Sequence, residues 1–424
     1  MLSQNSGFNI LQIGIVQFII TAIFFFAFLG TFPLFFGWDE YRVNAGVNDQ
    51  LIILKVMLFS GFTMFFLIFG AIFAKSFFKN PATLNSFHNV QYSKIETIIL
   101  LLLLLFVIFI VSIYVSKIPR IALLVSIIDG AQESHIARSA MGNSFSGKYH
   151  WYSLIMHDLA NVIVFSFFAI FLLKKEKKYF ILFTFSFLVS GFTALMAAQK
   201  APIGWLFIGL FMVFVAIRRR GLYPIGKVAI FSVFIFSLLA LTYKYFMGSS
   251  DLSIAFSNVF SRAFAGSIQP AYHYLEFFPA NHDFLYGASF PNPGGILPYE
   301  PFALSKEVMS WVNPGDLKEG VVGSMPTIFW GEAYANFGYV GIAIIPFVLG
   351  FIAYTVDILV SKIADSPLKV GFYVWLLIHY KGLAISGFST YLIDFYLVFI
   401  IFIVLLVLAL SNNFKIKLKG IRNK

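Results

Sequence analysis

The sequence predicts an all-α polytopic membrane protein, and three observations lead to that prediction. Of the 424 residues, 59% are hydrophobic and only 12% are charged, whereas an average soluble domain carries about 25% charged residues. Long apolar runs recur along the whole chain. The basic residues, which give a net charge of +11, stand in short clusters beside these runs. Such clusters are typical of membrane topology signals and do not indicate nucleic-acid binding.

The apolar runs predict about ten transmembrane helices, because a hydrocarbon core about 30 Å thick needs roughly 20 helical residues. We expect the runs to begin near Ile10, Leu51, Glu96, Tyr152, Tyr179, Pro202, Val228, Thr327, Val370 and Gly387. The first run lacks a following small-residue cleavage site, so we expect it to be retained as a span and not removed as a signal peptide. Residues 1–424 then form a single integral membrane domain.

The lysines and arginines between the runs assign a side to each connection. Every second connection holds most of them: Lys75, Lys79, Lys94, Lys174, Lys175, Lys177, Lys178, Arg218, Arg219, Arg220, Lys227, Lys362, Lys369, and in the tail Lys415, Lys417, Lys419, Arg422 and Lys424. The positive-inside rule makes these connections and both termini cytoplasmic. Two large loops, at about 117–151 and about 248–325, are then noncytoplasmic.

The two large loops differ in composition. The first begins with an amphipathic piece after Ile118, turns at Asp129 and Gly130, and continues into a polar stretch with Glu133, His135 and Arg138. The second is rich in proline and aromatic residues, and a loop of that length is usually functional. We expect residues 252–278 to be mostly helical and residues 287–323 to form an irregular cap.

Three cations near the noncytoplasmic side are candidates for binding a phosphate. Arg262 lies within an otherwise apolar helical stretch, and its guanidinium suits a bidentate phosphate contact. Lys200 occupies a tight hairpin on the side where the positive-inside rule disfavours a cation. Arg138 adds a second guanidinium from the other loop. The simpler alternatives are an arginine that snorkels to the interface, a lysine in contact with lipid headgroups, and a solvated charged turn.

The segment 331–341 joins the second loop to a span. On a helix, Glu332, Asn336 and Tyr339 would share one polar face, and Trp330, Tyr334, Phe337 and Gly341 would form an opposite packing stripe. Glu332 should then lie at headgroup height, where a carboxylate of raised pKa acts as a general base. Capping or pairing with Arg262 is the alternative role for Glu332.

Other acidic and basic residues give weaker signals. His273 and Glu276, three positions apart and next to Tyr272, are the second candidate for acid-base chemistry or sugar binding. Asp357 and Asp394 fall within apolar runs, where we favour interhelical hydrogen bonds. The chain has no cysteine, and its seven histidines show no metal-binding spacing, so we expect no metal site.

At these residues the chain resembles the Wzy-type oligosaccharide repeat-unit polymerases of bacterial O-antigen and capsular polysaccharide. The resemblance rests on Gly331-Glu332-Ala333-Tyr334-Ala335-Asn336-Phe337-Gly338 after a long loop, on Phe260-Ser261-Arg262 leading into 272–279, and on a basic residue at the outer end of the fifth span. Many relatives have arginine at that last position. Lys200 here preserves phosphate binding but not a bidentate contact.

The resemblance implies a GT-C-type membrane glycosyltransferase in the bacterial cytoplasmic (inner) membrane, with its active site facing the periplasm and no cofactor or metal. Its substrates would be two undecaprenyl-diphosphate-linked oligosaccharides, a donor and an acceptor, with membrane lipids around it and a chain-length regulator as a possible protein partner. Glu332 and Arg262 would be catalytic, and Arg262, Lys200 and Arg138 would bind the diphosphate. Tyr272, His273, Glu276, Tyr334 and Asn336 would contact sugars or take the acid-base role.

Two other functions fit part of the same pattern. An O-antigen ligase, or another lipid-linked glycan transferase, uses the same donor in the same compartment. A flippase for lipid-linked oligosaccharides also has many spans, but transporters usually show internal repeats and polar residues at the membrane midplane. Here the polar residues collect at the outer boundary, which favours the polymerase.

Overall fold

The structure is a computed structural model that describes residues 9, 11–78, 87, 90–142, 145, 147–246, 251–315 and 323–411. These residues are helical apart from loops, and their one β-bridge joins Gln12 and Leu222. Among the predicted cytoplasmic cations, Lys79 and those of the tail, Lys415, Lys417, Lys419, Arg422 and Lys424, lie outside this range, as do both termini.

Nine helical segments of the described chain are long and apolar enough to cross a membrane. They are Ile15–Phe35, Gln50–Phe77, Lys94–Lys117, Tyr149–Lys174, Lys177–Leu195, Ala201–Arg218, Ile225–Tyr245, Phe329–Ser361 and Phe388–Leu410. The first comprises α2 (Ile15–Ile23), a π-helical turn η1 (Phe24–Phe28) and α3 (Thr31–Phe35). The others contain α5 (Gln50–Phe77), α6 (Lys94–Lys117), α9 (Tyr149–Ser153), η2 (Leu154–Leu159), α10 (Ala160–Lys174), α11 (Lys177–Leu195), α12 (Ala201–Arg218), α13 (Ile225–Phe246), α18 (Phe329–Ser361), α20 (Phe388–Tyr391) and α21 (Phe395–Leu410).

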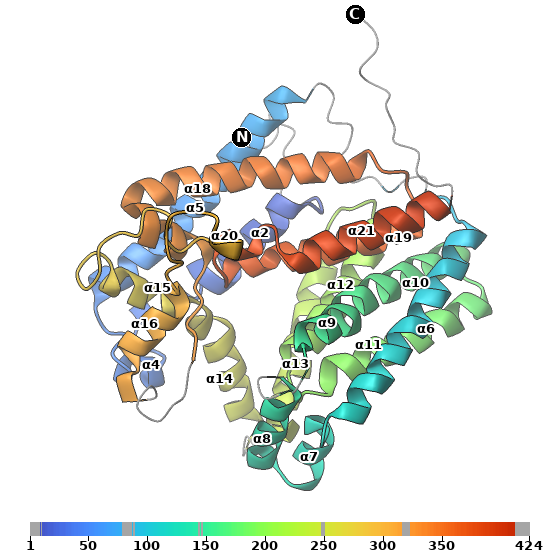
Figure 1. The fold of residues 1–424 in the computed structure, drawn as a ribbon, viewed down its shortest axis with the longest axis horizontal. Helices are drawn as coiled ribbons and strands as arrows, with labels where there is room; N and C mark the ends of the chain where they lie inside the picture. Colours follow the sequence, from blue (N-terminus) through green and yellow to red (C-terminus); the bar gives the residue numbers. More distant parts are fainter. Residues whose placement is uncertain are drawn as a thin grey trace, which may run out of the picture.

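The predicted span near Val370 is shorter than expected. It is helix α19 (Pro367–Tyr380), whose 14 residues continue into the short 3-10 turn η4 (Lys381–Ala384). At 1.5 Å per residue α19 is about 21 Å long, less than the hydrocarbon thickness. It packs against α2, α10, α12 and α21, which lie around it in Figure 1, and nearly all of its residues are buried. The residues of α19 are therefore apolar because they pack against other helices, and not because the helix crosses the membrane.

The short basic connections meet at one end of the helix bundle, which we call the basic end. The segment before α2 pairs with the α12–α13 connection, where the Ile13 N–H donates to the Gly221 carbonyl at 2.7 Å. The Gln91 N–H donates to the Asp365 carbonyl at 2.9 Å, which joins the segment before α6 to the α18–α19 connection. Connections that the charge pattern assigned to one side therefore lie together.

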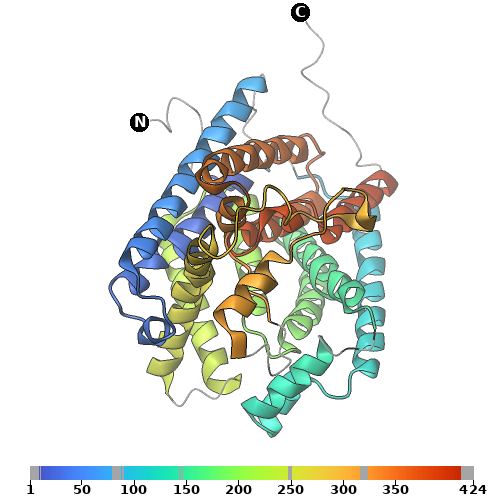
Figure 2. The ribbon, with the colours of Figure 1, turned by 60° about the vertical axis from the view of Figure 1, so that its left-hand side comes forward.

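The other end of the bundle, the loop end, carries the polar helices. These are α4 (Glu40–Asn44), α7 (Ala122–Ile128), α8 (Ala131–Met141), α14 (Leu252–Ala263), α15 (Ala265–Phe277) and α16 (Leu304–Val312). They follow the left and lower edges of the molecule in Figure 1, and Figure 2 shows them at the same end from another side. Residues 252–278 are mostly helical, as predicted, and within 287–323 the described part is irregular apart from α16, residues 314–315 and a 3-10 turn, η3 (Pro293–Gly295).

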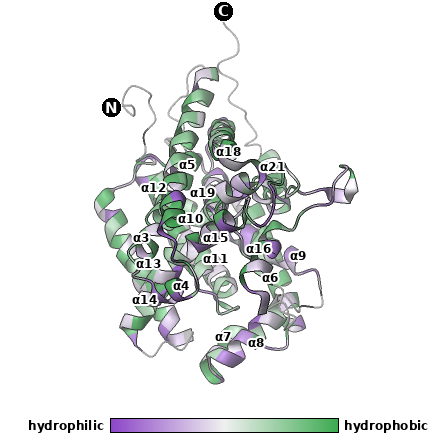
Figure 3. Ribbon diagram, turned by 90° about the vertical axis from the view of Figure 1, so that its left-hand side faces the viewer, coloured by the Kyte–Doolittle hydropathy of each residue, from purple (hydrophilic) through white to green (hydrophobic). Residues whose placement is uncertain are grey.

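Large apolar side chains cover the outside of the long helices. Examples are Phe65, Leu102, Phe109 and Leu188, each about 60% exposed, and the ribbon of Figure 3 is hydrophobic along the long helices such as α5. Contiguous apolar surface of this extent is not stable against water. Together with the nine long helices, it identifies a multi-pass membrane protein.

Helix α18 is sharply kinked, which corrects the predicted face pattern of 331–341. Gly338 has φ 60° and ψ −144°, so the helix direction changes there. Before the kink, residues from Phe329 to Asn336 are buried on every side, so the predicted polar face packs as tightly as the opposite stripe. After the kink, Tyr339 is 62% exposed and no longer follows Glu332 and Asn336. A single uninterrupted helix was the wrong assumption.

Candidate functional site

A cavity of about 430 Å³ lies between the first span, α12, α13 and α14. Most of its lining is apolar and comes from Phe18, Phe25, Phe26, Ile208, Phe231, Ile235, Phe236 and Leu239. Tyr243 and Phe231 both line it and lie 12 residues apart on α13, which corresponds to about 18 Å along the helix axis. The cavity therefore extends from the loop end into the span region.

The polar part of this cavity is cationic. Lys200, Arg262 and Lys381 line it, and the lining includes no acidic residue. Lys200 comes from the α11–α12 hairpin, Arg262 from the last turn of α14 and Lys381 from η4. Three separate segments thus direct positive charge toward one apolar cavity, an arrangement that suits a ligand with an anionic head and an apolar tail.

The three predicted phosphate-binding cations are electrostatic neighbours. Burial first, and then the charges of Arg262 and Arg138, lower the pKa of Lys200 from 10.5 to about 7. The Lys200 ammonium lies over the Tyr243 ring, 3.0 Å from its centroid. Arg262 is exposed, and no acidic side chain of the described residues pairs with its guanidinium. Arg138, on α8, is exposed near the same position.

Lys381 is a cavity residue that the sequence analysis did not identify. Its ammonium lies 4.5 Å from the ring centroid of Trp205, which also lines the cavity. The Asp158 carboxylate, which does not line the cavity, attracts the Lys381 charge and accepts a hydrogen bond from Trp375 Nε1 at 3.0 Å. The available signal was a single lysine at the end of an apolar run, which is rare enough inside a membrane protein to indicate function.

Arg42 is a second residue that the sequence analysis missed as part of the site. This side chain of α4 is 7% exposed, and its guanidinium binds the Asp39 carboxylate and the Ser261 hydroxyl. Ser261 in turn donates to Asp39 Oδ2 at 2.7 Å. A Cβ at Gly266 would lie 2.3 Å from Arg42 Nη2, so a larger residue there would displace the guanidinium. The network holds α4 against α14 at the residue before Arg262.

Glu332 is buried in a cradle of serine donors. Its Oε1 accepts hydrogen bonds from the Ser289 hydroxyl at 2.9 Å and from the Ser389 hydroxyl, and its Oε2 accepts one from the Ser389 N–H at 3.0 Å. A Cβ at Gly387 would lie 2.5 Å from Oε2, so the chain passes directly over the carboxylate. The predicted pairing with Arg262 is not found in the described structure, and Glu332 does not line the cavity.

Asn336, one turn after Glu332, holds the same loop. Its Oδ1 accepts from the Gly287 N–H at 2.9 Å, and its Nδ2 donates to the Ser289 hydroxyl and to the Glu332 carbonyl, both at 2.8 Å. Tyr334 packs among aromatic rings, with Phe284 5.6 Å and Tyr339 5.7 Å away between ring centroids. In this arrangement both side chains organise residues 284–290 against α18 and are not open to a ligand.

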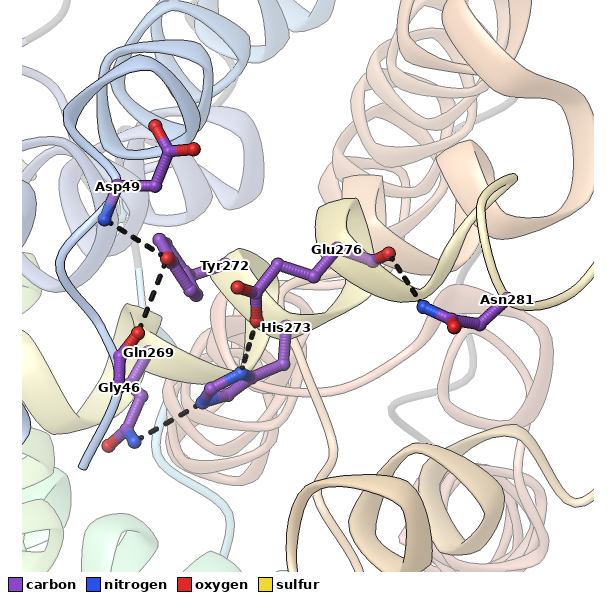
Figure 4. Close-up of polar contacts among 7 residues, drawn as sticks. All are labelled: Gly46, Asp49, Gln269, Tyr272, His273, Glu276 and Asn281. Atoms are coloured by element: carbon purple, nitrogen blue, oxygen red, sulfur yellow. Dashed lines mark hydrogen bonds and ion pairs between the residues drawn. The ribbon is translucent and has the colours of Figure 1, made fainter.

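His273 and Glu276 form a close polar pair on α15 (Figure 4). The His273 Nδ1 lies 2.9 Å from Glu276 Oε2, and Gln269 Nε2 lies 3.5 Å from the other ring nitrogen. Tyr272, on the same helix, accepts from the Asp49 N–H at 3.1 Å and so ties α15 to the segment before α5. The Glu276 side chain is 26% exposed, whereas that of His273 is 4% exposed. Glu276 is the member of the pair that a substrate can reach.

The two aspartates within apolar runs hold helix ends. Asp357 of α18 accepts from the Ile15 N–H of α2 at 3.0 Å and from the Tyr373 hydroxyl of α19 at 2.6 Å, which confirms the predicted interhelical bonding. Asp394 instead caps its own helix, accepting from the Leu397 N–H at 2.7 Å, with His379 Nε2 3.9 Å away.

No group of three or more His, Cys, Asp or Glu side chains within the described ranges is arranged to hold a metal ion. That the protein needs no metal or cofactor stays a prediction from the resemblance. Comparisons of the chain with protein-family models, with curated proteins and with solved structures give no match.

Proposed function

We propose that this protein is a metal-independent membrane glycosyltransferase, with a GT-C-type architecture, that polymerises undecaprenyl-diphosphate-linked oligosaccharide repeat units. The product is O-antigen or capsular polysaccharide, made at the outer face of the bacterial cytoplasmic membrane. One observation carries the proposal: a long apolar cavity between spans whose polar lining holds Lys200 and Arg262 without a carboxylate.

The shape and charge of this cavity match the chemistry of a lipid-linked diphosphate. An isoprenoid tail needs an apolar groove that extends into the membrane, and the lining from Tyr243 to Phe231 offers about 18 Å of it. A diphosphate needs positive charge where tail and head meet. Arg262 supplies a planar guanidinium, and no carboxylate among the described residues pairs with it. Lys200 and Arg138 add positive charge beside it.

In the proposed reaction an acceptor sugar hydroxyl attacks the anomeric carbon of the donor glycan. The new glycosidic bond forms as the bond between that carbon and the diphosphate oxygen breaks, and undecaprenyl diphosphate leaves with the bonding electron pair. The negative charge that develops on the leaving oxygen is stabilised by Arg262, Lys200 and Arg138, because cations that already lie around the cavity need little reorganisation during the reaction.

The proton of the attacking hydroxyl requires a base, and we assign this role to Glu276. Its carboxylate is partly exposed and is held by His273, whose ring forms the 2.9 Å contact with Oε2. A carboxylate that an adjacent group orients is a suitable general base. Glu332, the base that the sequence suggested first, already accepts three hydrogen bonds and is 5% exposed. We therefore assign it to positioning the loop 284–290.

The experiment that tests the function is deletion of the gene in its own host, followed by analysis of surface and lipid-linked glycans. Loss of a polymerase leaves surface lipid capped with single repeat units. Loss of a ligase leaves long polymer on its lipid carrier, and loss of a flippase leaves single lipid-linked units on the cytoplasmic side. The first pattern, reversed by the wild-type chain but not by Arg262→Ala, supports the proposal, and either other pattern overturns it.

A further inference from the structure

Three cations line the cavity, and only Lys200 and Arg262 belong to the set of residues assigned above. Lys200 and Arg262 approach from the α11–α12 hairpin and from α14. Lys381 approaches from η4, a segment that contacts α2. Lys200 and Arg262 are 62 positions apart, and Lys381 follows Arg262 by 119 positions, so the charges around the cavity do not arise from one local basic cluster.

The surroundings of Lys381 explain why it is suited to bind a ligand. Its charge lies over Trp205, and the indole face attracts a cation without consuming its hydrogen-bond donors. Asp158 lies outside the cavity lining, supplies the opposite charge, and is itself held by Trp375 Nε1 at 3.0 Å. Partial burial of a cation costs desolvation free energy. In membrane proteins, such charges usually have a function, for example in binding a ligand.

We propose that Lys381 is a further anion-binding residue of this cavity, and that from η4 it holds a phosphate group of an amphiphilic ligand together with Lys200 and Arg262. The ligand class is a lipid whose head carries one or two phosphates. The inference rests on the proposed function only in that the same cavity receives the lipid-linked substrate. Asp158 is a positioning residue, which acts through the Lys381 ammonium and does not touch the ligand.

The test uses the purified full-length chain in neutral detergent, with undecaprenyl diphosphate and phosphatidylglycerol as separate probes and native mass spectrometry to measure bound lipid. Lys381→Met should weaken binding of undecaprenyl diphosphate by about tenfold or more, because a charge-assisted contact is lost. Lys381→Arg should stay within about threefold of wild type. Lys117→Met removes a lysine that contacts Tyr152 outside the cavity and should leave binding unchanged.

Chemical rescue compares two treatments of a single folded preparation of Lys381→Cys, so a difference in stability between variants does not affect the result. The natural chain has no cysteine, so in Lys381→Cys the only thiol is at the cavity. Treatment of one preparation with 2-aminoethyl methanethiosulfonate adds a primary ammonium and should restore binding, whereas methyl methanethiosulfonate adds a neutral group and should not. Equal binding after both treatments, or full binding by folded Lys381→Met, overturns the inference.

The two lipid probes distinguish the source of the phosphate. Dependence on Lys381 for undecaprenyl diphosphate but not for phosphatidylglycerol supports a lipid-linked substrate as the occupant. Dependence for both supports a general anionic-lipid site at the same residue. Lipid binding is measured without turnover, so its outcome is independent of polymerase activity. If binding depended on Lys381 but deletion of the gene did not shorten the glycans, this inference would hold and the polymerase proposal would fail.

Discussion

The backbone N–H of Ser389 donates a 3.0 Å hydrogen bond to Glu332 Oε2, although the two residues are 57 positions apart in the chain. With the Ser289 hydroxyl on the other oxygen, the carboxylate joins three segments at the loop end: α18, the loop 284–290 and α20, which contains Ser389. A group that is engaged on both oxygens and buried has the features of a structural anchor.

The first prediction concerns this anchor. In Glu332→Gln one oxygen remains an acceptor, but the new NH2 group faces donors, so we expect a loss of about 1–3 kcal/mol in the free energy of unfolding. Glycan polymerisation per folded molecule should change only a few-fold. Thermal unfolding in detergent and glycan length in complemented cells measure the two effects. If the variant melted at the wild-type temperature but polymerised more than a hundredfold more slowly, Glu332 would be the general base and our assignment would be wrong.

The second prediction concerns the base assigned here. Glu276→Gln removes the proton acceptor but preserves the size of the side chain, so polymerisation should fall about 10²- to 10⁴-fold, as for loss of a general base. Binding of undecaprenyl diphosphate should be unchanged, because Glu276 does not line the cavity. The matched control is Glu300→Gln, an exposed position in the same loop region. Normal glycan length with Glu276→Gln would exclude this residue as the base.

The third prediction concerns Arg262. Arg262→Ala should lower the polymerisation rate about 10- to 150-fold, which corresponds to the roughly 1.5–3 kcal/mol of a charge-assisted hydrogen bond. Arg262→Lys should recover part of this rate, since charge remains but the bidentate geometry does not. Arg120→Ala, which removes an exposed arginine paired with Asp129 at 3.6 Å, serves as control and should behave as wild type. Equal rates for Arg262→Ala and Arg120→Ala would remove Arg262 from the site.

The helices, and the grouping of the basic connections at one end of the bundle, could be predicted, because they depend on residues that are close together in the sequence. Apolar length and the alternation of basic connections predicted the helices and the meeting of those connections at one end, and the helices of 252–278 followed from their composition. The contacts of the site were not predictable, because their partners are distant in the chain. Arg42 and Ser261 are 219 positions apart, and nothing local to either indicates the other.

Errors of the prediction had physical causes that a linear reading cannot detect. The segment near Val370 is as apolar as a span, but the apolar character of α19 serves packing inside the bundle. Lys381 follows that run and had no neighbouring polar pattern to make it stand out. The predicted faces of 331–341 were wrong because the helix is kinked at Gly338, so residues after it do not continue the faces of residues before it.

The fourth prediction is a pH dependence. Burial and the charges of Arg262 and Arg138 lower the pKa of Lys200 to about 7, so this lysine loses its charge as the pH rises through 7, while in the unfolded chain it stays charged to about 10.5. Binding of undecaprenyl diphosphate should therefore weaken by up to about tenfold between pH 7 and 8. In Lys200→Arg the guanidinium does not titrate, so the affinity should vary less over this range.

The same shift has a consequence for folding. Between about pH 7 and 10.5 the unfolded chain binds the proton that the folded Lys200 has released, so this residue makes the free energy of unfolding increase with pH in that window.

In the binding experiment, comparison of Lys200→Arg with wild type at each pH cancels any titration of the lipid phosphate itself. If wild type and Lys200→Arg showed the same pH profile for binding, Lys200 would not be a titrating part of the site.

The fifth prediction concerns the kink that separates the two halves of α18. Gly338 has a φ of 60°, and a Cβ there would lie 3.2 Å from the Phe284 ring. Alanine adopts this backbone conformation only with strain, so Gly338→Ala should reduce the free energy of unfolding by about 1–3 kcal/mol and lower the melting temperature. Gly191→Ala is the matched control, because Gly191 is helical and a Cβ there meets no atom within 4 Å. Alanine is the better helix former, so this control should melt at or above the wild-type temperature. If both variants melted alike, the kink would not be a conformation that only glycine supports, and the positions of Glu332 and Asn336 would not depend on it.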